Sequence, residues 1–125
     1  MKNDNPKSFR DYLVWQKSKD LALKVYLITK SFPREEIYGL SSQMRRSAVS
    51  VPSNIAEGFG RRSESEFLRY LRFSSGSLYE LQTQTEIANE LGYINNDTFE
   101  SFISESDIIG KMISSLIKKI LNDSR

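Results

Sequence analysis

Arginine is the residue type that most clearly offers chemistry in this 125-residue chain. Six of the nine arginines fall within 28 consecutive positions, and they are Arg45, Arg46, Arg61, Arg62, Arg69 and Arg72. Guanidinium groups bind phosphate oxygens, neighbouring serine hydroxyls add hydrogen bonds, and Tyr70 and Tyr79 can stack on bases. The pattern therefore favours a nucleic-acid-binding surface. The alternative is an ordinary solvated helix face, paired in part with Glu57, Glu64 and Glu66.

The absence of cysteine and histidine excludes much enzyme chemistry. It removes disulfides, the usual zinc sites, and Ser-His-Asp or Cys-His catalytic centres. Seven carboxylates between residues 80 and 107 are dispersed around the helical wheels, which is more typical of a solvated or subunit-facing surface than of a magnesium site. Gly58-Phe59-Gly60 lacks the Lys-Ser or Lys-Thr pair of a phosphate loop. We therefore predict no enzyme activity, no metal and no cofactor.

Charge is strongly segregated along the sequence, although the net charge is only +2. Residues 1–31 carry a net charge of +4 and residues 32–72 a net charge of +2. Residues 73–110 hold seven acidic and no basic side chains, and residues 111–125 return to +3. We therefore expect oppositely charged surfaces on the folded molecule. A basic surface can bind nucleic acid or the acidic surface of a second copy.

Apolar periodicity predicts the elements that must position these groups. It indicates amphipathic helices over about residues 10–32, 40–58, 63–91 and 97–122. The boundaries rest on Pro33, Gly58, Gly60 and Gly92 as helix ends and on capping boxes at Ser63 and Asp97. No alternating strand pattern or long linker interrupts them. We predict a single all-α domain over residues 1–125, an antiparallel up-down four-helix bundle.

Pro52 lies inside the second predicted helix. It removes the amide that would bond the Ala48 carbonyl, so a break into two short helices is one outcome. The apolar stripe nevertheless keeps its phase from Ala48 to Ile55. We therefore predict a kinked but continuous helix, with the freed carbonyl bonded to a nearby polar side chain or to water.

Several apolar side chains lie outside the predicted core stripes. They are Trp15, Tyr26, Val49, Pro52, Ala56, Phe73 and Ile87. A monomeric bundle needs one apolar stripe of about 100° on each helix. One interpretation of the surplus is a broad core in which helices are flanked on two sides. The other is an interface with further copies of the chain, to which the segregated charge adds complementarity.

The N-terminal segment does not have the pattern of a secretory signal. Its first twenty residues carry charges throughout and contain no long apolar run. The later sequence offers no apolar stretch of the length that a transmembrane helix needs. We therefore expect a cytoplasmic protein that does not associate with membranes.

Residues 38–58 read YGLSSQMRRSAVSVPSNIAEG and are followed by Gly60-Arg61 and Glu66-Phe67. Further motifs are Phe9 with Leu13-Val14-Trp15, Phe32-Pro33, Gly76-Ser77-Leu78 with Glu80-Leu81, and Leu91-Gly92-Tyr93. Together they closely resemble the bacterial four-helix-bundle proteins encoded in intervening sequences of 23S ribosomal RNA genes. The same family includes the accessory proteins of diversity-generating retroelements. The central Arg-Arg-(x)5-Pro-Ser-Asn-Ile-Ala-Glu-Gly segment is the most specific match.

The resemblance implies an up-down bundle with a bent second helix, assembled into a homopentameric ring. It also implies a basic surface that, in the retroelement accessory proteins, binds nucleic acid and a reverse transcriptase. Residues that match the family's positively charged positions are Arg45, Arg46 and Arg61. Those that match its helix-two signature, with a structural role, are Pro52, Asn54, Ile55, Glu57 and Gly58.

Two functional hypotheses follow. The first is a nonenzymatic oligomeric protein that binds RNA or DNA through its arginine-rich surface. The second is an assembly or adaptor module for a protein partner such as a reverse transcriptase, without nucleic-acid binding of its own.

Overall fold

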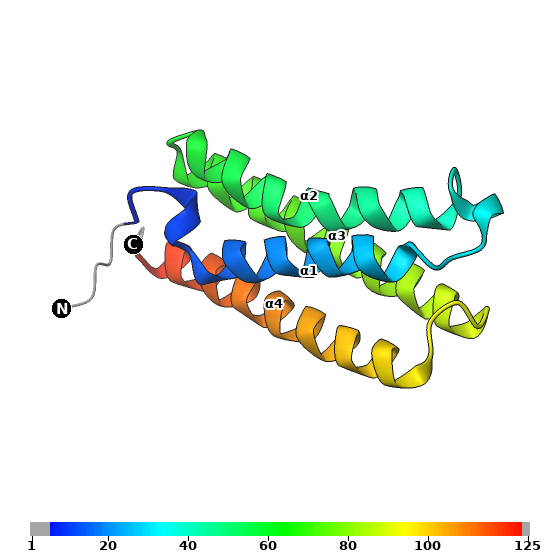
Figure 1. The fold of residues 1–125 in the computed structure, drawn as a ribbon. Coiled ribbons are helices and arrows are strands. Elements are labelled where there is room, and N and C mark those ends of the chain that lie inside the picture. Colours follow the sequence, from blue (N-terminus) through cyan, green and yellow to red (C-terminus); the bar gives the residue numbers. More distant parts are fainter. Residues whose placement is uncertain (1–5, 124–125) are drawn as a thin grey trace.

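The computed structural model describes residues 6–123. Its elements are η1 (Phe9–Asp11), α1 (Leu13–Thr29), η2 (Arg34–Glu36), α2 (Leu40–Gly60), α3 (Glu64–Glu90) and α4 (Asn96–Asp123), where η marks a short 3-10 turn. Figure 1 shows the four α-helices lying along one another. The α1–α2 and α3–α4 connections lie at one end of the molecule, and the α2–α3 connection lies at the other (Figure 1). The predicted all-helical four-helix bundle is confirmed.

The predicted apolar stripes form the core of this bundle. Met44, Ile55, Leu71, Leu81 and Ile113 have no exposed surface, and every other residue of the predicted stripes is buried or half-buried. The interior also contains side chains that the stripes did not include, among them Ala22, Tyr70, Gln84 and Ile94. Helical spacing alone therefore identified most of the interior.

The first helix is shorter than predicted, and a separate 3-10 turn precedes it. Ser8 caps this turn, because its hydroxyl accepts a hydrogen bond from the Arg10 amide at 3.1 Å and its own amide donates to Asp11 at 3.2 Å. Three aromatic rings then join the start of α1 to the α2–α3 connection. They are Tyr12, Phe59 and Phe67, whose ring centroids lie 5.7, 5.9 and 6.0 Å apart.

The α2–α3 connection differs from the predicted glycine cap. Helix α2 continues to Gly60, and Arg62 adopts the left-handed conformation with φ 58°. Gly58 instead lies buried inside the helix, where an added Cβ would be 2.6 Å from the Tyr70 Cβ. Gly58 therefore allows α2 and α3 to approach closely. Gly92, with φ +84°, closes α3 as predicted.

The starts of α3 and α4 also differ from the predicted capping boxes. The Ser63 hydroxyl accepts from the Glu66 amide at 3.3 Å, but the Glu66 carboxylate accepts from a guanidinium instead of returning to Ser63. Helix α4 begins at Asn96, and Asn95 caps it by accepting from the Thr98 amide at 2.8 Å. The predicted cap at Asp97 is wrong because an asparagine two positions earlier reaches a free amide first.

Helix α2 is continuous through Pro52, so the alternative of two short helices is wrong. Two backbone carbonyl groups next to the proline accept hydrogen bonds from side chains. Asn54 Nδ2 donates to the Ser50 carbonyl at 2.8 Å, and Ser74 Oγ of α3 donates to the Val51 carbonyl at 2.7 Å. The kink at this point stays a prediction.

Within residues 6–123, none of the helices is both long enough and apolar enough to span a membrane.

Candidate nucleic-acid interface

The fold divides the six candidate arginines between two regions. Arg61, Arg62, Arg69 and Arg72 lie around the α2–α3 connection, whereas Arg45 and Arg46 lie in the first turns of α2. At about 1.5 Å per residue, the 16 positions between Arg45 and Arg61 place them roughly 24 Å apart along the helix. The arginine-rich segment of the sequence is therefore not one continuous surface.

Arg61 is held against Tyr70 at the end of the bundle. Its Nη2 donates to Tyr70 Oη at 2.7 Å and to Glu57 Oε2 at 3.0 Å, and its Cζ lies 5.0 Å from the Tyr70 ring centroid. The hydrogen bond to Glu57, followed by the interaction with Tyr70, raises the pKa of Arg61 above its ordinary value. Arg61 is therefore a fixed positive charge with a defined orientation.

Arg69 continues this arrangement along α3. Its Cζ lies 5.4 Å from the Tyr70 ring centroid and 5.1 Å from that of Phe73, and its Nη1 donates to Glu66 Oε1 at 3.2 Å. The Tyr70 and Phe73 rings meet edge to face at 5.4 Å. We call Arg61, Tyr70, Arg69 and Phe73 the arginine–aromatic cluster. Phe73 is 45% exposed, so the cluster presents an aromatic surface beside two cations.

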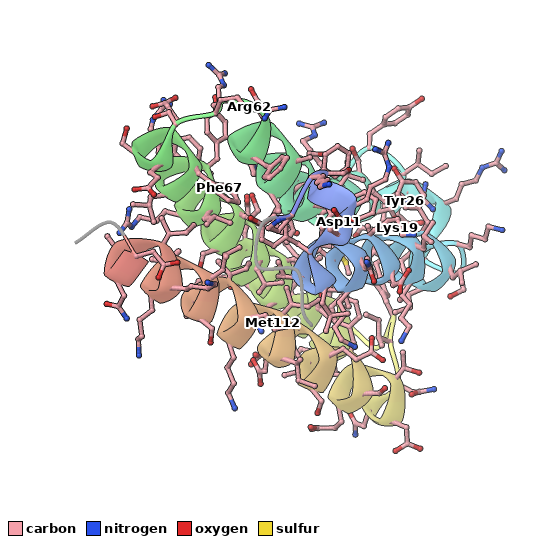
Figure 2. The ribbon with its side chains drawn as sticks, turned by 90° about the vertical axis from the view of Figure 1, so that its left-hand side faces the viewer. Asp11, Lys19, Tyr26, Arg62, Phe67 and Met112 are labelled. Atoms are coloured by element: carbon pink, nitrogen blue, oxygen red, sulfur yellow. The ribbon has the colours of Figure 1, made fainter. Side chains whose placement is uncertain are left out.

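Arg62 and Arg72 flank this cluster with exposed side chains. Neither side chain makes a hydrogen bond or an ion pair with another residue in the range 6–123. Figure 2 shows Arg62 on the outside of the molecule, where α2 passes into α3. Both guanidinium groups are therefore available to an external anion.

Arg45 and Arg46 have different surroundings from the other four. Arg45 is half-buried, its Nε donates to Thr29 Oγ1 at 2.8 Å, and its Cζ lies 4.8 Å from the Tyr26 ring centroid. Arg45 thus helps to pack α2 on α1. Arg46 is exposed and lines a groove between α2 and α3.

The candidate interface residues outside the core stripes fall into two groups. Tyr26, Val49, Phe73 and Ile87 are between 41% and 46% exposed, on three different helices. Trp15 and Ala56 are half-buried and Pro52 is buried, so these three side chains offer less surface to a second copy than the first four do. The oligomer interface stays a prediction.

Folding converts the charge segregation along the chain into segregation along the bundle. Arg61 and Arg62 lie in the α2–α3 connection, and the lysine-containing end of α4 lies at the same end of the molecule (Figure 1). The acidic segments 80–90 and 97–107 lie towards the opposite end (Figure 1). Glu105 pairs there with Lys24 of α1. In the part of the chain that the structure describes, no three acidic side chains converge into a group that could hold a metal ion.

Some features of this surface were detectable from spacing and others were not. Arg69 and Phe73 are four positions apart on a helix, which places them on one face. The contact between Arg61 and Tyr70 joins the residue that follows α2 to α3, and it depends on the close approach at Gly58. Sequence spacing within one helix does not reveal such a contact.

Comparison with known proteins identifies the family. The family model for the 23S rRNA-intervening sequence protein matches residues 10–115. A crystal structure from Bacteroides thetaiotaomicron, of a protein with unknown function from the S23 ribosomal protein family, is 26% identical, with a TM-score of 0.78. The match covers 85% of this chain and 96% of that one. No curated protein matches the sequence. The chain therefore belongs to the 23S rRNA-intervening sequence protein family.

Proposed function

We propose that this protein is a nonenzymatic oligomer that binds RNA or DNA at the α2–α3 end of the bundle. The observation that carries the proposal is the arginine–aromatic cluster, flanked by the exposed side chains of Arg62 and Arg72. A single strand presents phosphates and bases together, and this surface offers cations and an aromatic face together.

Each group has a distinct part in this proposal. Arg62 and Arg72 contact phosphates, because neither has to give up an ion pair within residues 6–123. Phe73 stacks on a base, and Tyr70 orients Arg61 and Arg69 beside it. The pairs with Glu57 and Glu66 are exposed to solvent, so exchanging them for phosphate costs little.

Oligomerisation, as the homopentameric ring that the family resemblance implies, would multiply this surface. The partly exposed apolar side chains Tyr26, Val49 and Ile87 supply candidate contacts between copies. In a ring of parallel copies, the basic ends lie on the same side, and several weak contacts with one strand then combine into a much higher avidity.

A second candidate function is an adaptor for a protein partner, such as a reverse transcriptase, without nucleic-acid binding. It is favoured by the pairing of Arg61 and Arg69 with Glu57 and Glu66, which lowers the net charge of the cluster. Phe73 would then be an apolar anchor in a protein interface.

Fluorescence anisotropy with labelled single-stranded RNA and DNA tests the first candidate. We expect binding that weakens steeply between 50 and 200 mM salt. The double variant R62A/R72A should bind about tenfold more weakly and lower the salt slope by about 1.4 on a single strand.

The matched control is K30A/R34A, which removes the same charge near the α1–α2 connection at the other end of the molecule. Equal losses in both double variants would contradict a localised surface. Absence of binding at low salt would favour the adaptor.

A further inference from the structure

A second group of cations and aromatic rings lies at the start of the helical part of the chain. The Arg10 Cζ lies 4.5 Å from the centroid of the Phe9 ring, and the Phe9 and Trp15 rings meet edge to face at 5.0 Å. One turn further along α1, the Lys19 Nζ lies 5.5 Å from the Trp15 ring centroid. We call Phe9, Arg10, Trp15 and Lys19 the N-terminal stack. Its residues belong to η1 and α1, so it is separate from the arginine–aromatic cluster.

Local hydrogen bonds fix the turn that carries the first half of the stack. The Asp11 carboxylate accepts from the Lys7 amide at 3.0 Å and from the Ser8 amide at 3.2 Å. The Gln16 Nε2 of α1 donates to the Arg10 carbonyl oxygen at 2.8 Å, which ties the turn to the helix. The turn is therefore ordered before a ligand binds, and an ordered site loses less conformational entropy on binding.

Both cations of the stack are accessible. The side chains of Arg10 and Lys19 are exposed, and those of Phe9 and Trp15 are half-buried. Arg10 forms no ion pair with any residue in the range 6–123. Lys19 lies 3.9 Å from one oxygen of Asp20, and this pair is weak because both side chains are more than half exposed. The stack thus offers two positive charges to an external ligand.

The stack combines these charges with flat groups, which points to a ligand that has both phosphates and free bases. The Arg10 guanidinium lies against the Phe9 ring, and a guanidinium plane supported in this way stacks on a base. Lys19 is a compact charge on a flexible stem, so a base can replace it over the Trp15 ring while the ammonium turns to the adjacent phosphate. An acidic peptide would satisfy the cations but leave the rings without a partner. A duplex keeps its bases stacked inside, whereas a single strand presents them.

The N-terminal stack lies at the same end of the molecule as the arginine–aromatic cluster. Figure 1 shows η1 beside the end of the bundle where α2 passes into α3. The Tyr12 ring, directly after η1, lies 5.7 Å from the Phe59 ring and 5.9 Å from the Phe67 ring, measured between centroids. A strand that contacts both groups would bind the second at a high effective concentration once the first is bound.

We propose that the N-terminal stack is a second contact site for single-stranded RNA or DNA. One base stacks on Trp15, a neighbouring base stacks on Arg10, and Lys19 binds a phosphate of the same segment. The inference rests on the proposed function for the class of ligand, and it adds a site built from η1 and α1.

Trp15 is the single tryptophan of the chain, so its fluorescence reports directly on the stack. A base stacked on the indole quenches this fluorescence. We expect oligothymidine of about twelve nucleotides to quench it in a saturable way at low salt. The duplex of this strand with oligodeoxyadenosine carries more phosphate but no free base, and it should leave the fluorescence nearly unchanged.

Fluorescence anisotropy with the same labelled oligothymidine tests the cations. R10A/K19A should weaken binding about tenfold. K30A/R34A also removes one lysine and one arginine, but at the other end of the molecule, and should have a smaller effect.

Two substitutions of the tryptophan test the stacking role. W15L keeps an apolar side chain without an aromatic face and should bind about tenfold more weakly. W15F keeps a ring and should retain most of the affinity. Circular dichroism checks that both variants keep their helical content, and a loss in W15L that W15F does not restore overturns the stacking role.

The outcomes separate this inference from the proposed function. Binding of oligothymidine without quenching of Trp15, or with equal losses in R10A/K19A and K30A/R34A, overturns the N-terminal stack and leaves the α2–α3 surface in place. Quenching that appears when the protein concentration alone is raised assigns Trp15 to contacts between copies and also overturns it.

The double variant at the α2–α3 end completes the comparison. Quenching and affinity that are both unchanged in R62A/R72A support the N-terminal stack and overturn the α2–α3 surface. Absence of any strand binding at low salt overturns both.

Discussion

The α2–α3 pair and the α1–α4 pair are stabilised in different ways. Between α2 and α3, Gly58 permits a close backbone approach, and Ser74 donates a buried hydrogen bond to the Val51 carbonyl. Between α1 and α4, an exposed ion pair joins Lys24 to Glu105 beside a cavity of about 390 Å³. Buried contacts therefore hold α2 against α3, whereas α1 and α4 are joined in part by an ion pair that is exposed to solvent.

This difference explains where the candidate sites lie. The arginine–aromatic cluster and the groove that Arg46 lines both lie at α2 and α3, whose spacing is fixed by buried contacts. A binding surface needs such a fixed framework, because small displacements weaken oriented hydrogen bonds and stacking. The exposed ion pair between α1 and α4 fixes the relative position of those two helices less strongly. The following predictions test this contrast, from the largest expected effect to the smallest.

Gly58→Ala should produce the largest effect. The added Cβ would lie 2.6 Å from the Tyr70 Cβ and 3.1 Å from Phe67 Cδ1, so α2 and α3 must move apart. We expect a loss of about 2 kcal/mol in the free energy of unfolding, measured by urea denaturation. Gly60→Ala is the control, because nothing lies within 4 Å of its added Cβ, and it should be neutral or stabilise by up to about 1 kcal/mol. Equal effects of both variants would contradict the close approach.

Ser74→Ala removes the buried hydrogen bond between α3 and α2. Ser74 has no exposed surface, and its Oγ lies 2.7 Å from the Val51 carbonyl oxygen. We expect the variant to lose about 1 kcal/mol in the free energy of unfolding. Ser104→Ala, at an exposed position on α4, should change stability by less than about 0.5 kcal/mol. A similar loss of stability in both variants would show that the hydrogen bond from Ser74 to the Val51 carbonyl does not stabilise the fold.

Lys24→Met tests the α1–α4 pair by removing the charge while keeping most of the side-chain length. Both partners are partly exposed, at 49% and 38%, so we expect a loss of only about 0.5 kcal/mol. The difference from wild type should shrink in 1 M salt, because screening weakens a solvated pair. Lys118→Met, an exposed α4 lysine, is the control. A salt-independent loss larger than that of Ser74→Ala would reverse the ranking of the two helix pairs.

Tyr93→Phe tests a contact at the end of the molecule opposite the arginine–aromatic cluster, and we expect the smallest effect. The Tyr93 hydroxyl donates to Glu36 Oε2 at 3.0 Å, and this bond raises the pKa of Tyr93 above its ordinary value. The bond requires the protonated hydroxyl. Its stabilisation is therefore fully present below about pH 10 and is lost as the pH rises through the raised pKa. Urea denaturation should show a small gap between wild type and variant that closes at high pH, and a constant gap would contradict this account.

The extent of sequence-based prediction differs between the core and the helix ends. Met44, Ile55 and Leu81 were identified because helical spacing brings residues three and four apart onto one face. The capping residues Arg62 and Asn95 were missed, since several neighbouring polar residues or glycines can end or begin a helix. Which one does so depends on where the next helix packs.

The candidate site shows the same limit. The arginines were evident from the sequence, but their division into two regions was not. Arg45 packs on Tyr26 of α1, whereas Arg61 packs on Tyr70 of α3, and both contacts connect different helices. The groove between α2 and α3 that Arg46 lines also escaped prediction, because its lining residues come from two different helices.

The sequence by itself determined four amphipathic helices, their apolar faces, the segregated charge and the family of the chain. These properties depend on residue type and on spacing within one helix, which are local. Only the tertiary structure decided which arginines are oriented by aromatic rings, which are exposed without an ion pair, and which polar groups share a groove. Those relations depend on the distance between α2 and α3, and that distance is set by Gly58 against Tyr70 and by Ser74 against Val51, pairs that lie far apart in the sequence.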